Sequence, residues 1–296
     1  MVKRIVAISL GMVIGITILF YFSYMSVANH FVRYLWWQFT SAVPSSSDTV
    51  NSAGTTIHYT VYGQGEPILM LHGGLSNKLS WFSQLPELSS SGYRLILLDS
   101  RGHGLSGLGS ATLDYRLMVA DARAVLDRLK IKHTDVIGWS DGANSALLMA
   151  SLYPERIGRI VAISGNYSPE GLTPEARQEN NERTTGIKYW LYRWWTGAGE
   201  KFQELERRLK HLWSSGPILS AEDLEKISSP VLIIIGEHDL ISVNHATAMA
   251  RLLPNSRLLI IKNGGHSTLI THAEDVNSQI RDFLAGGGPE ANNLSL

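Results

Sequence analysis

The sequence predicts an α/β fold built on a mostly parallel sheet with helices on both sides. Short, nearly continuous apolar runs are typical of strands that are covered on both faces. These runs alternate with helical patterns, as in a parallel sheet with crossover helices. The 296 residues, 44% of them hydrophobic, suffice for one large α/β domain. The predicted strands are residues 57–62, 67–71, 94–98, 135–139, 160–164, 231–235 and 257–261.

Helices are expected between these strands. Apolar residues recur at spacings of four, three and four from Met118 to Leu129, which predicts one buried helical stripe. Residues 141–152 and 273–284 also have helical patterns. Residues 166–227 contain no convincing strand and are rich in aromatic side chains. An insertion at this place between two core strands predicts a helical cap over the strand ends.

The N-terminus predicts a membrane or export segment. Lys3 and Arg4 precede residues 5–25, which include no charged residue and approach the length needed to cross a bilayer. We expect residues 1–28 to form a signal anchor or transmembrane helix. The positive charges then leave the main domain on the non-cytoplasmic side, periplasmic or extracellular. The alternative is a secretory signal that is cleaved after Ala28.

The remaining boundaries follow from composition. Residues 29–54 are expected to be a juxtamembrane segment followed by a linker, because 41–54 are small, polar and interrupted by proline and glycine. The folded domain is expected at 55–285. The tail at 286–296 is rich in glycine and asparagine, which predicts a flexible end.

Composition excludes several classes of function. Lys and Arg together number 26, as do Asp and Glu, so no overall charge attracts the chain to nucleic acid. The chain has no cysteine, which excludes disulfides, thiol nucleophiles and thiolate metal sites. No spacing of His, Asp and Glu resembles a metal site, and neither a metal nor a cofactor is expected.

The strongest local signal is the pentapeptide Gly-Trp-Ser-Asp-Gly at 138–142. It follows a predicted strand and precedes a predicted helix. A serine on such a tight turn has strained backbone angles and an exposed hydroxyl, and the flanking glycines leave room for the turn. Taken alone, the motif also fits an ordinary serine in a glycine-rich turn.

Two more residues make the serine a candidate nucleophile. A serine hydroxyl needs a base, and the base needs an orienting carboxylate. Asp239 comes just past the strand at 231–235, and His266 lies in the loop after the strand at 257–261. The order Ser140, Asp239, His266 predicts a catalytic triad that attacks an ester or amide bond of a small molecule.

An oxyanion hole is expected beside this triad. Gly74 follows a buried strand in the run His72-Gly73-Gly74, and Asp141 follows the serine at the start of a helix. The backbone N–H groups of Gly74 and Asp141 are therefore the expected donors. His72 is expected to hold the loop.

Five motifs together resemble the α/β-hydrolase superfamily over about residues 55–285. They are HGG at 72–74, DSRGHGLS at 99–106, GWSDGA at 138–143, GEHD at 236–239 and GGHS at 264–267. Within that superfamily the chain is similar to the biphenyl-hydrolase-like or valacyclovirase-like group. The resemblance implies the α/β-hydrolase fold with an eight-stranded type of sheet, and the triad Ser140, Asp239 and His266.

Two substrate-binding hypotheses remain open. The Asp141 carboxylate either caps its own helix or faces the acyl pocket and attracts the ammonium group of an amino-acid ester. Trp190 and Trp194 are proposed to bind substrate, although they could equally pack the cap onto the core or touch a membrane.

The expected activity is that of a carboxylesterase-like serine hydrolase. The same machinery also serves acyl transfer to an alcohol or to peroxide, and cleavage of a carbon–carbon bond. A function of another class, a non-catalytic membrane-tethered binding module, would leave the triad idle.

Overall fold

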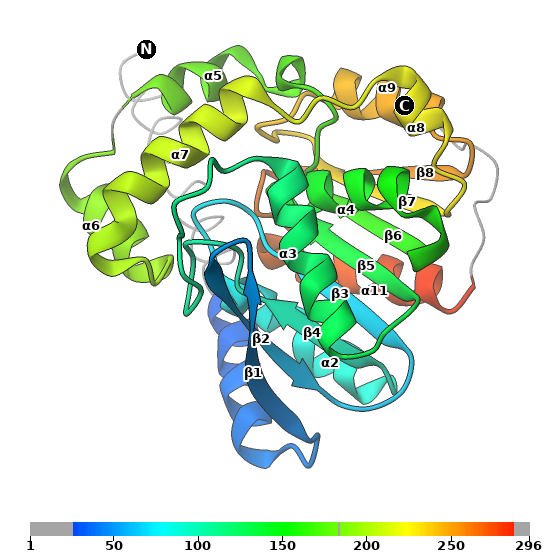
Figure 1. Cartoon of the computed structure of the whole chain (residues 1–296). Coiled ribbons are helices and arrows are strands. Elements are labelled where there is room, and N and C mark those ends of the chain that lie inside the picture. Colours follow the sequence, from blue (N-terminus) through cyan, green and yellow to red (C-terminus); the bar gives the residue numbers. More distant parts are fainter. Residues whose placement is uncertain (1–25, 183, 287–296) are drawn as a thin grey trace, which may run out of the picture.

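The computed structural model describes residues 26–182 and 184–286. Its strands form one sheet in the order β1-β2-β4-β3-β5-β6-β7-β8 (Figure 1). The pairs β1–β2 and β2–β4 are antiparallel, and every other neighbouring pair is parallel. The strands are β1 (Ser45–Ser52), β2 (Thr55–Tyr62), β3 (Pro67–Leu71), β4 (Arg94–Leu98), β5 (Thr134–Trp139), β6 (Ile157–Ile163), β7 (Val231–Gly236) and β8 (Ser256–Ile261).

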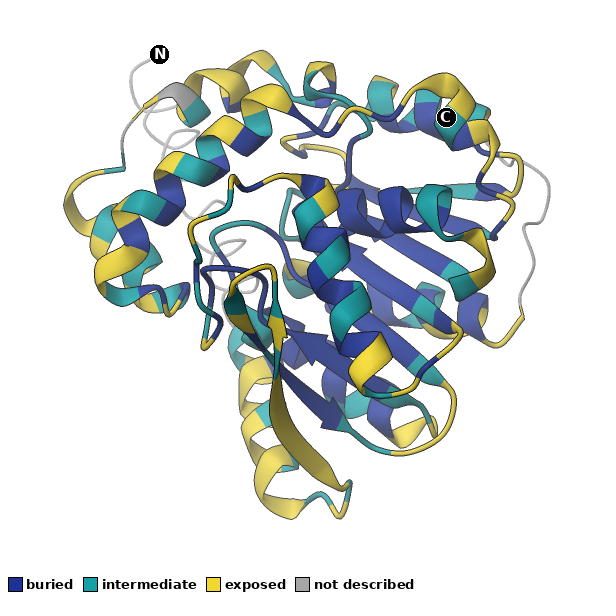
Figure 2. Ribbon diagram, viewed as in Figure 1, coloured by how far each residue is buried: buried dark blue, intermediate teal, exposed yellow. Residues whose placement is uncertain are grey.

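Helices cover both faces of the sheet, and the strands supply side chains to two cores. In β3, Leu69 and Leu71 enter one core, whereas Ile68 and Met70 enter the other, because successive side chains point to opposite faces. Figure 2 shows the central strands β3 to β7 as largely buried and β1 as exposed. The helices α3 (Tyr115–Arg128), α4 (Asp141–Leu152) and α9 (Val243–Leu252) supply side chains to the first core, and η2 (Pro154–Arg156) follows α4 without entering it. The second core receives side chains from η1 (Lys78–Ser83), α2 (Leu85–Ser90), α10 (Thr268–Thr271) and α11 (Ala273–Leu284).

A helical cap occupies the chain between β6 and β7 (Figure 1). Its main helix, α7, buries Phe202, Leu205, Leu209 and Leu212, whose spacings of three, four and three put them on one face. The cap comprises η3 (Pro169–Gly171), α5 (Pro174–Asn181), α6 (Gly186–Trp195), η4 (Gly199–Lys201), α7 (Phe202–Ser215) and α8 (Ala221–Glu225).

The linker expected at 41–54 is wrong in its main part, because residues 45–52 form strand β1. β1 pairs with β2 along its whole length through a tight hairpin. The two turn residues, Ala53 and Gly54, both have positive φ, as favoured hairpin turns require. β1 is an edge strand with mostly exposed polar side chains, so it carries no apolar alternation that the sequence could have revealed.

Residues 26–40 form a helix, here called the N-terminal helix, which packs on the second core. Phe31 meets the Phe82 ring edge-on at 5.4 Å, and Trp37 lies 5.7 Å from the Tyr62 ring. The juxtamembrane segment predicted from residue 29 is therefore part of the folded body as far as residue 40.

Residues 1–25 of the membrane segment predicted at 1–28 lie outside the described residues, whereas residues 26–28 begin the N-terminal helix. The predicted tail also lies outside the described residues from residue 287 onward. Within 26–182 and 184–286, no helix is both long and apolar enough to span a bilayer.

Candidate active site

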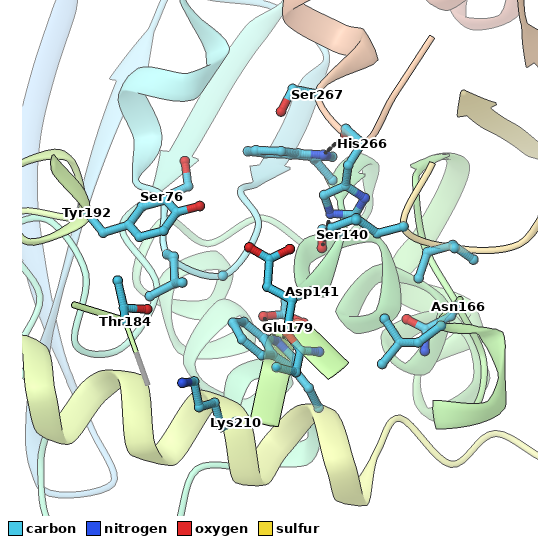
Figure 3. A pocket seen from close by; sticks show the side chains of 18 of the residues that line it. Ser76, Ser140, Asp141, Asn166, Glu179, Thr184, Tyr192, Lys210, His266 and Ser267 are labelled. Carbon is cyan, nitrogen blue, oxygen red and sulfur yellow. Dashed lines mark hydrogen bonds between the residues drawn. The ribbon is translucent and has the colours of Figure 1, made fainter. Parts of the chain in front are cut away.

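Three strand ends bring Ser140, His266 and Asp239 together at one edge of the sheet. Ser140 follows β5, Asp239 follows β7, and His266 follows β8. The His266 Nε2 atom lies 2.9 Å from the Ser140 Oγ atom, and His266 Nδ1 lies 2.7 Å from Asp239 Oδ1 (Figure 3). With the proton on Nδ1 donated to the carboxylate, Nε2 can accept the serine proton.

Ser140 lies on a sharp turn between β5 and α4. Its φ of 54° and ψ of −119° are unfavourable for a residue with a side chain. The turn requires close backbone approach on both sides. A Cβ at Gly138 would lie 2.3 Å from the Gly142 carbonyl oxygen, and one at Gly142 would lie 1.9 Å from the Leu71 carbonyl oxygen. The two glycines of the motif are therefore sterically required.

The Asp239 carboxylate is buried and hydrogen-bonded on both oxygens. Oδ1 accepts from His266 and from the Ile241 N–H at 3.1 Å, while Oδ2 accepts from the Ser164 hydroxyl at 2.6 Å. Burial alone would raise the pKa of Asp239. The hydrogen bond and charge of His266 and the Ser164 hydroxyl outweigh burial, so the pKa lies below its ordinary value. The carboxylate is thus held in its charged form.

Ser164 is a site residue that the sequence analysis missed. It is the first residue after β6, buried, with a positive φ of 53°. Besides Asp239, its hydroxyl reaches the His266 carbonyl oxygen at 3.3 Å, which also accepts the Trp139 indole N–H at 2.8 Å. These two side chains hold the histidine loop. Ser164 is the last residue of the strand predicted at 160–164, whereas the strand ends at Ile163.

The two expected oxyanion donors, Gly74 and Asp141, both line the cavity beside Ser140. Asp141 is the first residue of α4, so no carbonyl of that helix can accept its N–H. Gly74 packs tightly against the Asp141 side chain, since a Cβ at Gly74 would lie 2.4 Å from Asp141 Oδ2. Leu75 next to it has a φ of 53° and also lines the cavity.

The Asp141 carboxylate is buried and receives two side-chain donors. The Tyr115 hydroxyl lies 2.6 Å from Oδ1, and the Trp213 indole nitrogen lies 2.9 Å from Oδ2. Trp213 belongs to α7, so this bond ties the cap to the residue after the serine. Burial raises the pKa of Asp141, and the hydrogen bonds from Tyr115 and Trp213 oppose that rise. Burial also raises the pKa of Tyr115 well above its ordinary value.

A cavity of about 660 Å³ opens between Ser140 and the cap. Near the serine its wall is largely aromatic and aliphatic, and toward α5 and α7 it becomes polar (Figure 3). The lining includes Trp139, Tyr192, Trp195, Trp213, Leu172, Ile241 and Ile270, and at the polar end Glu179, Thr184, Lys188 and Lys210.

Trp190 and Trp194, proposed as substrate-binding residues, do not line this cavity. Their side chains are 62% and 77% exposed on the outer face of α6. Tyr192 and Trp195, on the inner face, line the cavity instead. The sequence could not separate them, because aromatic residues occupy both faces of this short helix.

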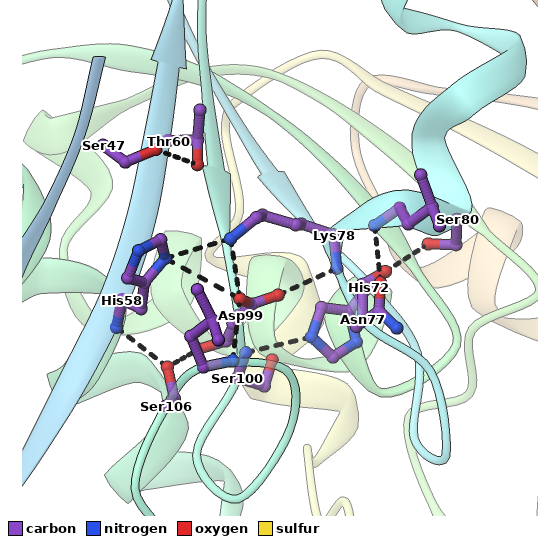
Figure 4. Close-up of polar contacts among 12 residues, drawn as sticks. Ser47, His58, Thr60, His72, Asn77, Lys78, Ser80, Asp99, Ser100 and Ser106 are labelled. Carbon is purple, nitrogen blue, oxygen red and sulfur yellow. Dashed lines mark hydrogen bonds and ion pairs between the residues drawn. The ribbon is translucent and has the colours of Figure 1, made fainter. Parts of the chain in front are cut away.

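A buried polar cluster behind the site holds the loops that carry it (Figure 4). His72 Nε2 accepts the Ser100 N–H at 2.9 Å, and its Nδ1 lies 2.7 Å from the Gly73 carbonyl oxygen. Asp99 accepts both the backbone N–H and the ammonium group of Lys78, the latter at 2.8 Å. Burial lowers the pKa of His72, which favours the neutral ring. These contacts fit a structural role for His72.

Among the described residues, no group of three His, Asp or Glu side chains is placed to hold a metal ion.

Comparisons with known proteins agree with this architecture. A family model described as the alpha/beta hydrolase fold matches residues 66–179 and 172–273. The serine hydrolase BPHL of Homo sapiens is 27% identical over 260 residues, covering 83% of this chain and 88% of that protein. Carboxylesterase YbfK of Bacillus subtilis is 27% identical over 241 residues, covering 74% of this chain and 80% of its own.

Solved structures show the same fold. A meta-cleavage product hydrolase from Pseudomonas fluorescens superposes with a TM-score of 0.73 at 20% identity, covering 81% of this chain and 98% of that one. Since the family model spans well over half of the sequence, the chain belongs to the α/β-hydrolase superfamily.

Proposed function

We propose that this hydrolase cleaves carboxylic esters of small molecules through a serine-bound acyl intermediate. The observation that carries the proposal is the continuous chain of hydrogen bonds from Ser140 Oγ through His266 to the buried Asp239, at 2.9 and 2.7 Å. A serine, a neutral imidazole and a charged carboxylate in this order form the arrangement that acyl transfer requires.

In the first step, His266 Nε2 takes the Ser140 proton while Oγ attacks the carbonyl carbon of the ester. The carbonyl π electrons move to oxygen, where the N–H groups of Gly74 and Asp141 stabilise the negative charge. The electron pair then returns, the bond to the leaving alcohol breaks, and the imidazolium protonates that alcohol. Asp239 stabilises the imidazolium without taking its proton.

In the second step, water replaces the alcohol. His266 removes a proton from the water, whose oxygen attacks the acyl carbon. Collapse of the second tetrahedral species breaks the bond to Oγ, and His266 returns the proton to Ser140. The acid leaves, and both side chains are restored.

A fluorophosphonate probe tests this proposal directly. The wild-type chain should be labelled, and Ser140→Ala should lose both labelling and most esterase activity. Ser267→Ala is a matched control, because Ser267 also lines the cavity and forms no side-chain cap to its helix. Full activity of Ser140→Ala would refute the proposed nucleophile, and unlabelled wild type would favour an idle binding module.

A carbon–carbon bond hydrolase is the second candidate, because the fold is similar to that of a meta-cleavage product hydrolase. Acyl transfer to an alcohol or to peroxide would use the same residues. A panel of simple esters, vinylogous diketone acids and competing acceptors separates the three. Ester and carbon–carbon hydrolysis release the same acid but different leaving groups, an alcohol or a protonated carbon fragment, whereas acyl transfer gives a new ester or a peracid.

Selectivity for amino-acid esters would require Asp141 to attract an ammonium group. The donors Tyr115 and Trp213 already occupy the carboxylate, which favours its structural role. Hydrolysis of an α-amino ester and of its deaminated analogue should therefore show the same preference in wild type and Asp141→Asn. A preference for the amino ester that disappears in the variant would restore the ammonium hypothesis.

We also propose that residues 1–28 anchor the domain on the non-cytoplasmic side of a membrane. Lys3, Arg4 and the uncharged residues 5–25 support this proposal. The alternative is secretion after cleavage behind Ala28. Protease treatment of intact cells tests the side, and sequencing the N-terminus of the mature protein tests the cleavage.

A further inference from the structure

Two helices expose large apolar side chains on the same side of the molecule. They are the N-terminal helix and α6 of the cap. Phe39 is 86% exposed and Trp194 is 77% exposed. The set, here called the apolar surface, consists of Val32, Leu35, Trp36, Phe39, Leu105, Ile187, Trp190, Leu191 and Trp194.

Each of the two helices already has another face that packs on the protein. In the N-terminal helix, Tyr34 and Trp37 pack against the second core. In α6, Tyr189 meets the Phe202 ring at 5.3 Å, and the Trp195 indole reaches the Ser76 hydroxyl at 3.3 Å. The exposed residues are therefore not needed to hold the helices in place. A surface of this kind marks an interaction site.

The two helices are neighbours in the fold. Tyr34 of the N-terminal helix, Leu105, and Gly197 just after α6 line a common cavity of about 310 Å³. The Gly104 N–H donates to the Thr196 carbonyl oxygen at 2.6 Å, which joins α6 to the loop that carries Leu105. The exposed Leu105 therefore lies between the two helices, and Figure 2 shows exposed residues along both, with α6 at the left and the N-terminal helix at the bottom of the view.

The charges that the two helices themselves carry are positive, although Glu179 of α5 lies beside α6. Neither residues 26–40 nor residues 186–195 include an acidic residue. Lys188 pairs with Glu179, which leaves Arg33 and Arg193 as the basic groups of the two helices. Arg193 lies 5.3 Å over the Trp190 ring. Tryptophans flanked by arginines suit the boundary between lipid tails and anionic headgroups.

The sequence before the N-terminal helix also favours a lipid bilayer as the partner of the apolar surface. Residues 5–25 contain no charged residue and lead directly into that helix at residue 26. The apolar surface thus begins where a stretch of lipid-compatible sequence ends. A soluble partner protein would explain neither this continuity nor the absence of acidic residues.

We propose that the apolar surface rests on a lipid bilayer, so that α6 separates the bilayer from the catalytic cavity. The outer face of α6 supplies Trp190 and Trp194 to the surface, whereas its inner face supplies Tyr192 and Trp195 to the cavity. This placement deepens the proposed esterase function, on which it rests, by naming its substrate class: apolar esters dissolved in the membrane.

Single-cysteine labelling of the full chain tests the docking, because the natural sequence contains no cysteine. Trp194→Cys carries a nitroxide on the apolar surface. Ile218→Cys is the matched control, because Ile218 is an apolar cap residue with 78% exposure outside that surface. Both spin-labelled variants are placed in vesicles of phosphatidylcholine and phosphatidylglycerol. The collision rate of each nitroxide with lipid-soluble oxygen is then compared with its collision rate with a water-soluble nickel chelate.

The label at 194 should become more accessible to oxygen and less accessible to the nickel chelate, while the label at 218 should remain water-accessible. Equal nickel accessibility at 194 and 218 would overturn the proposal. Spin–spin broadening at 194 that disappears on dilution with unlabelled chain would also overturn it, since a second copy would then cover the surface. The measurement needs no activity and can be repeated in Ser140→Ala.

A kinetic comparison tests the substrate class. Trp190→Ser together with Trp194→Ser should lower hydrolysis of a long-chain ester in vesicles by about tenfold or more, because two large apolar side chains no longer enter the lipid. Hydrolysis of a short water-soluble ester should stay unchanged, as should both rates in Ile218→Ser. Equal loss on both esters would overturn the named substrate class, and absence of any hydrolysis in wild type would refute the esterase proposal alone.

Discussion

Replacing Trp213 with phenylalanine removes one hydrogen bond between the cap and Asp141, the residue that follows Ser140. The ring remains, but the indole N–H that lies 2.9 Å from Asp141 Oδ2 is lost. The carboxylate keeps the Tyr115 hydroxyl at 2.6 Å. Because Asp141 is buried, water cannot replace the missing donor without opening the cap.

The expected loss depends on the charge of Asp141. A hydrogen bond to a charged group contributes about 1.5–3 kcal/mol, and one between neutral groups about 0.5–1.5 kcal/mol. Burial already raises the pKa of Asp141, and losing the donor raises that pKa further in the folded protein only. A raised carboxyl pKa leaves folding unaffected below the unfolded pKa, destabilises the fold increasingly as pH rises from the unfolded to the folded pKa, and has its full effect above the folded pKa. The destabilisation caused by Trp213→Phe should therefore be smaller at about pH 3, where the carboxyl group is mostly protonated in both states, than at pH 9.

Urea unfolding at both pH values measures this difference in the free energy of unfolding. Trp195→Phe is the matched control, because the Trp195 indole donates at 3.3 Å to a neutral hydroxyl and its loss should be small at either pH. A destabilisation by Trp213→Phe that is the same at pH 3 and pH 9 would refute a charge-assisted bond. A double-mutant cycle that combines Trp213→Phe with Asp141→Asn should assign the pH-dependent part of the destabilisation to the interaction between the two residues.

Three further predictions concern the triad, the core and the elbow. Asp239→Asn should lower kcat by roughly 10³–10⁴-fold with little change in KM, because His266 loses the charge that orients it. Steady-state kinetics of ester hydrolysis measure both constants, and a loss in kcat below tenfold would contradict the proposed role of Asp239. Asp121→Leu should destabilise the fold by about 3–5 kcal/mol, because it leaves the buried Arg101 guanidinium without its partner at 2.6 Å. Adding Arg101→Met should recover most of the lost free energy of unfolding, as measured by denaturant titration. Gly142→Ala should prevent soluble expression, because its Cβ would lie 1.9 Å from a backbone carbonyl oxygen of β3. The control Gly265→Ala should fold, because the nearest atom to its Cβ would lie at 3.7 Å. Soluble Gly142→Ala with native stability would contradict the steric argument.

The sequence predicted those parts of the site whose chemistry imposes a fixed spacing. Ser140 needs glycines at both sides of a tight turn, and the acid and base must follow strands that end at the same edge of the sheet. Spacings of this kind can be recognised in a single sequence. The structure places Asp239 and His266 within hydrogen-bond distance in that way.

The rest depended on tertiary contacts that leave little trace in the sequence. β1 is polar because it is a solvent-exposed edge strand, so its backbone pairing with β2 was not apparent. Ser164 gains its role only because β6 ends between β5 and β7. Trp194 on the outer face of α6 and Trp195 on its inner face are neighbours in the sequence. Only packing of α6 against Ser76 and Phe202 decides which face is turned toward the protein.

The contacts of the cap differ at its two ends, and this difference bears on how substrate enters. At α7, Trp213 donates to a buried carboxylate, so moving this end away would leave Asp141 with one donor fewer. At α6, the Trp195 indole reaches a neutral hydroxyl at 3.3 Å, and the outer face is unpacked. The Asn77 side chain and the Gly104 N–H also donate to the carbonyl oxygens of Trp195 and Thr196, and these bonds again join neutral groups. Separating neutral partners costs less than uncovering a buried charge.

We therefore expect the cap to open at α6 while α7 remains seated. That movement would open the cavity at the apolar surface, so an ester leaving the bilayer would meet Tyr192 and Trp195 before it reached Ser140. A reducible bis-maleimide crosslink between cysteines introduced at Ser76 and Trp195 should then suppress hydrolysis of vesicle-borne esters until a reductant cleaves the crosslink. Unchanged hydrolysis in the crosslinked variant would contradict opening at this end.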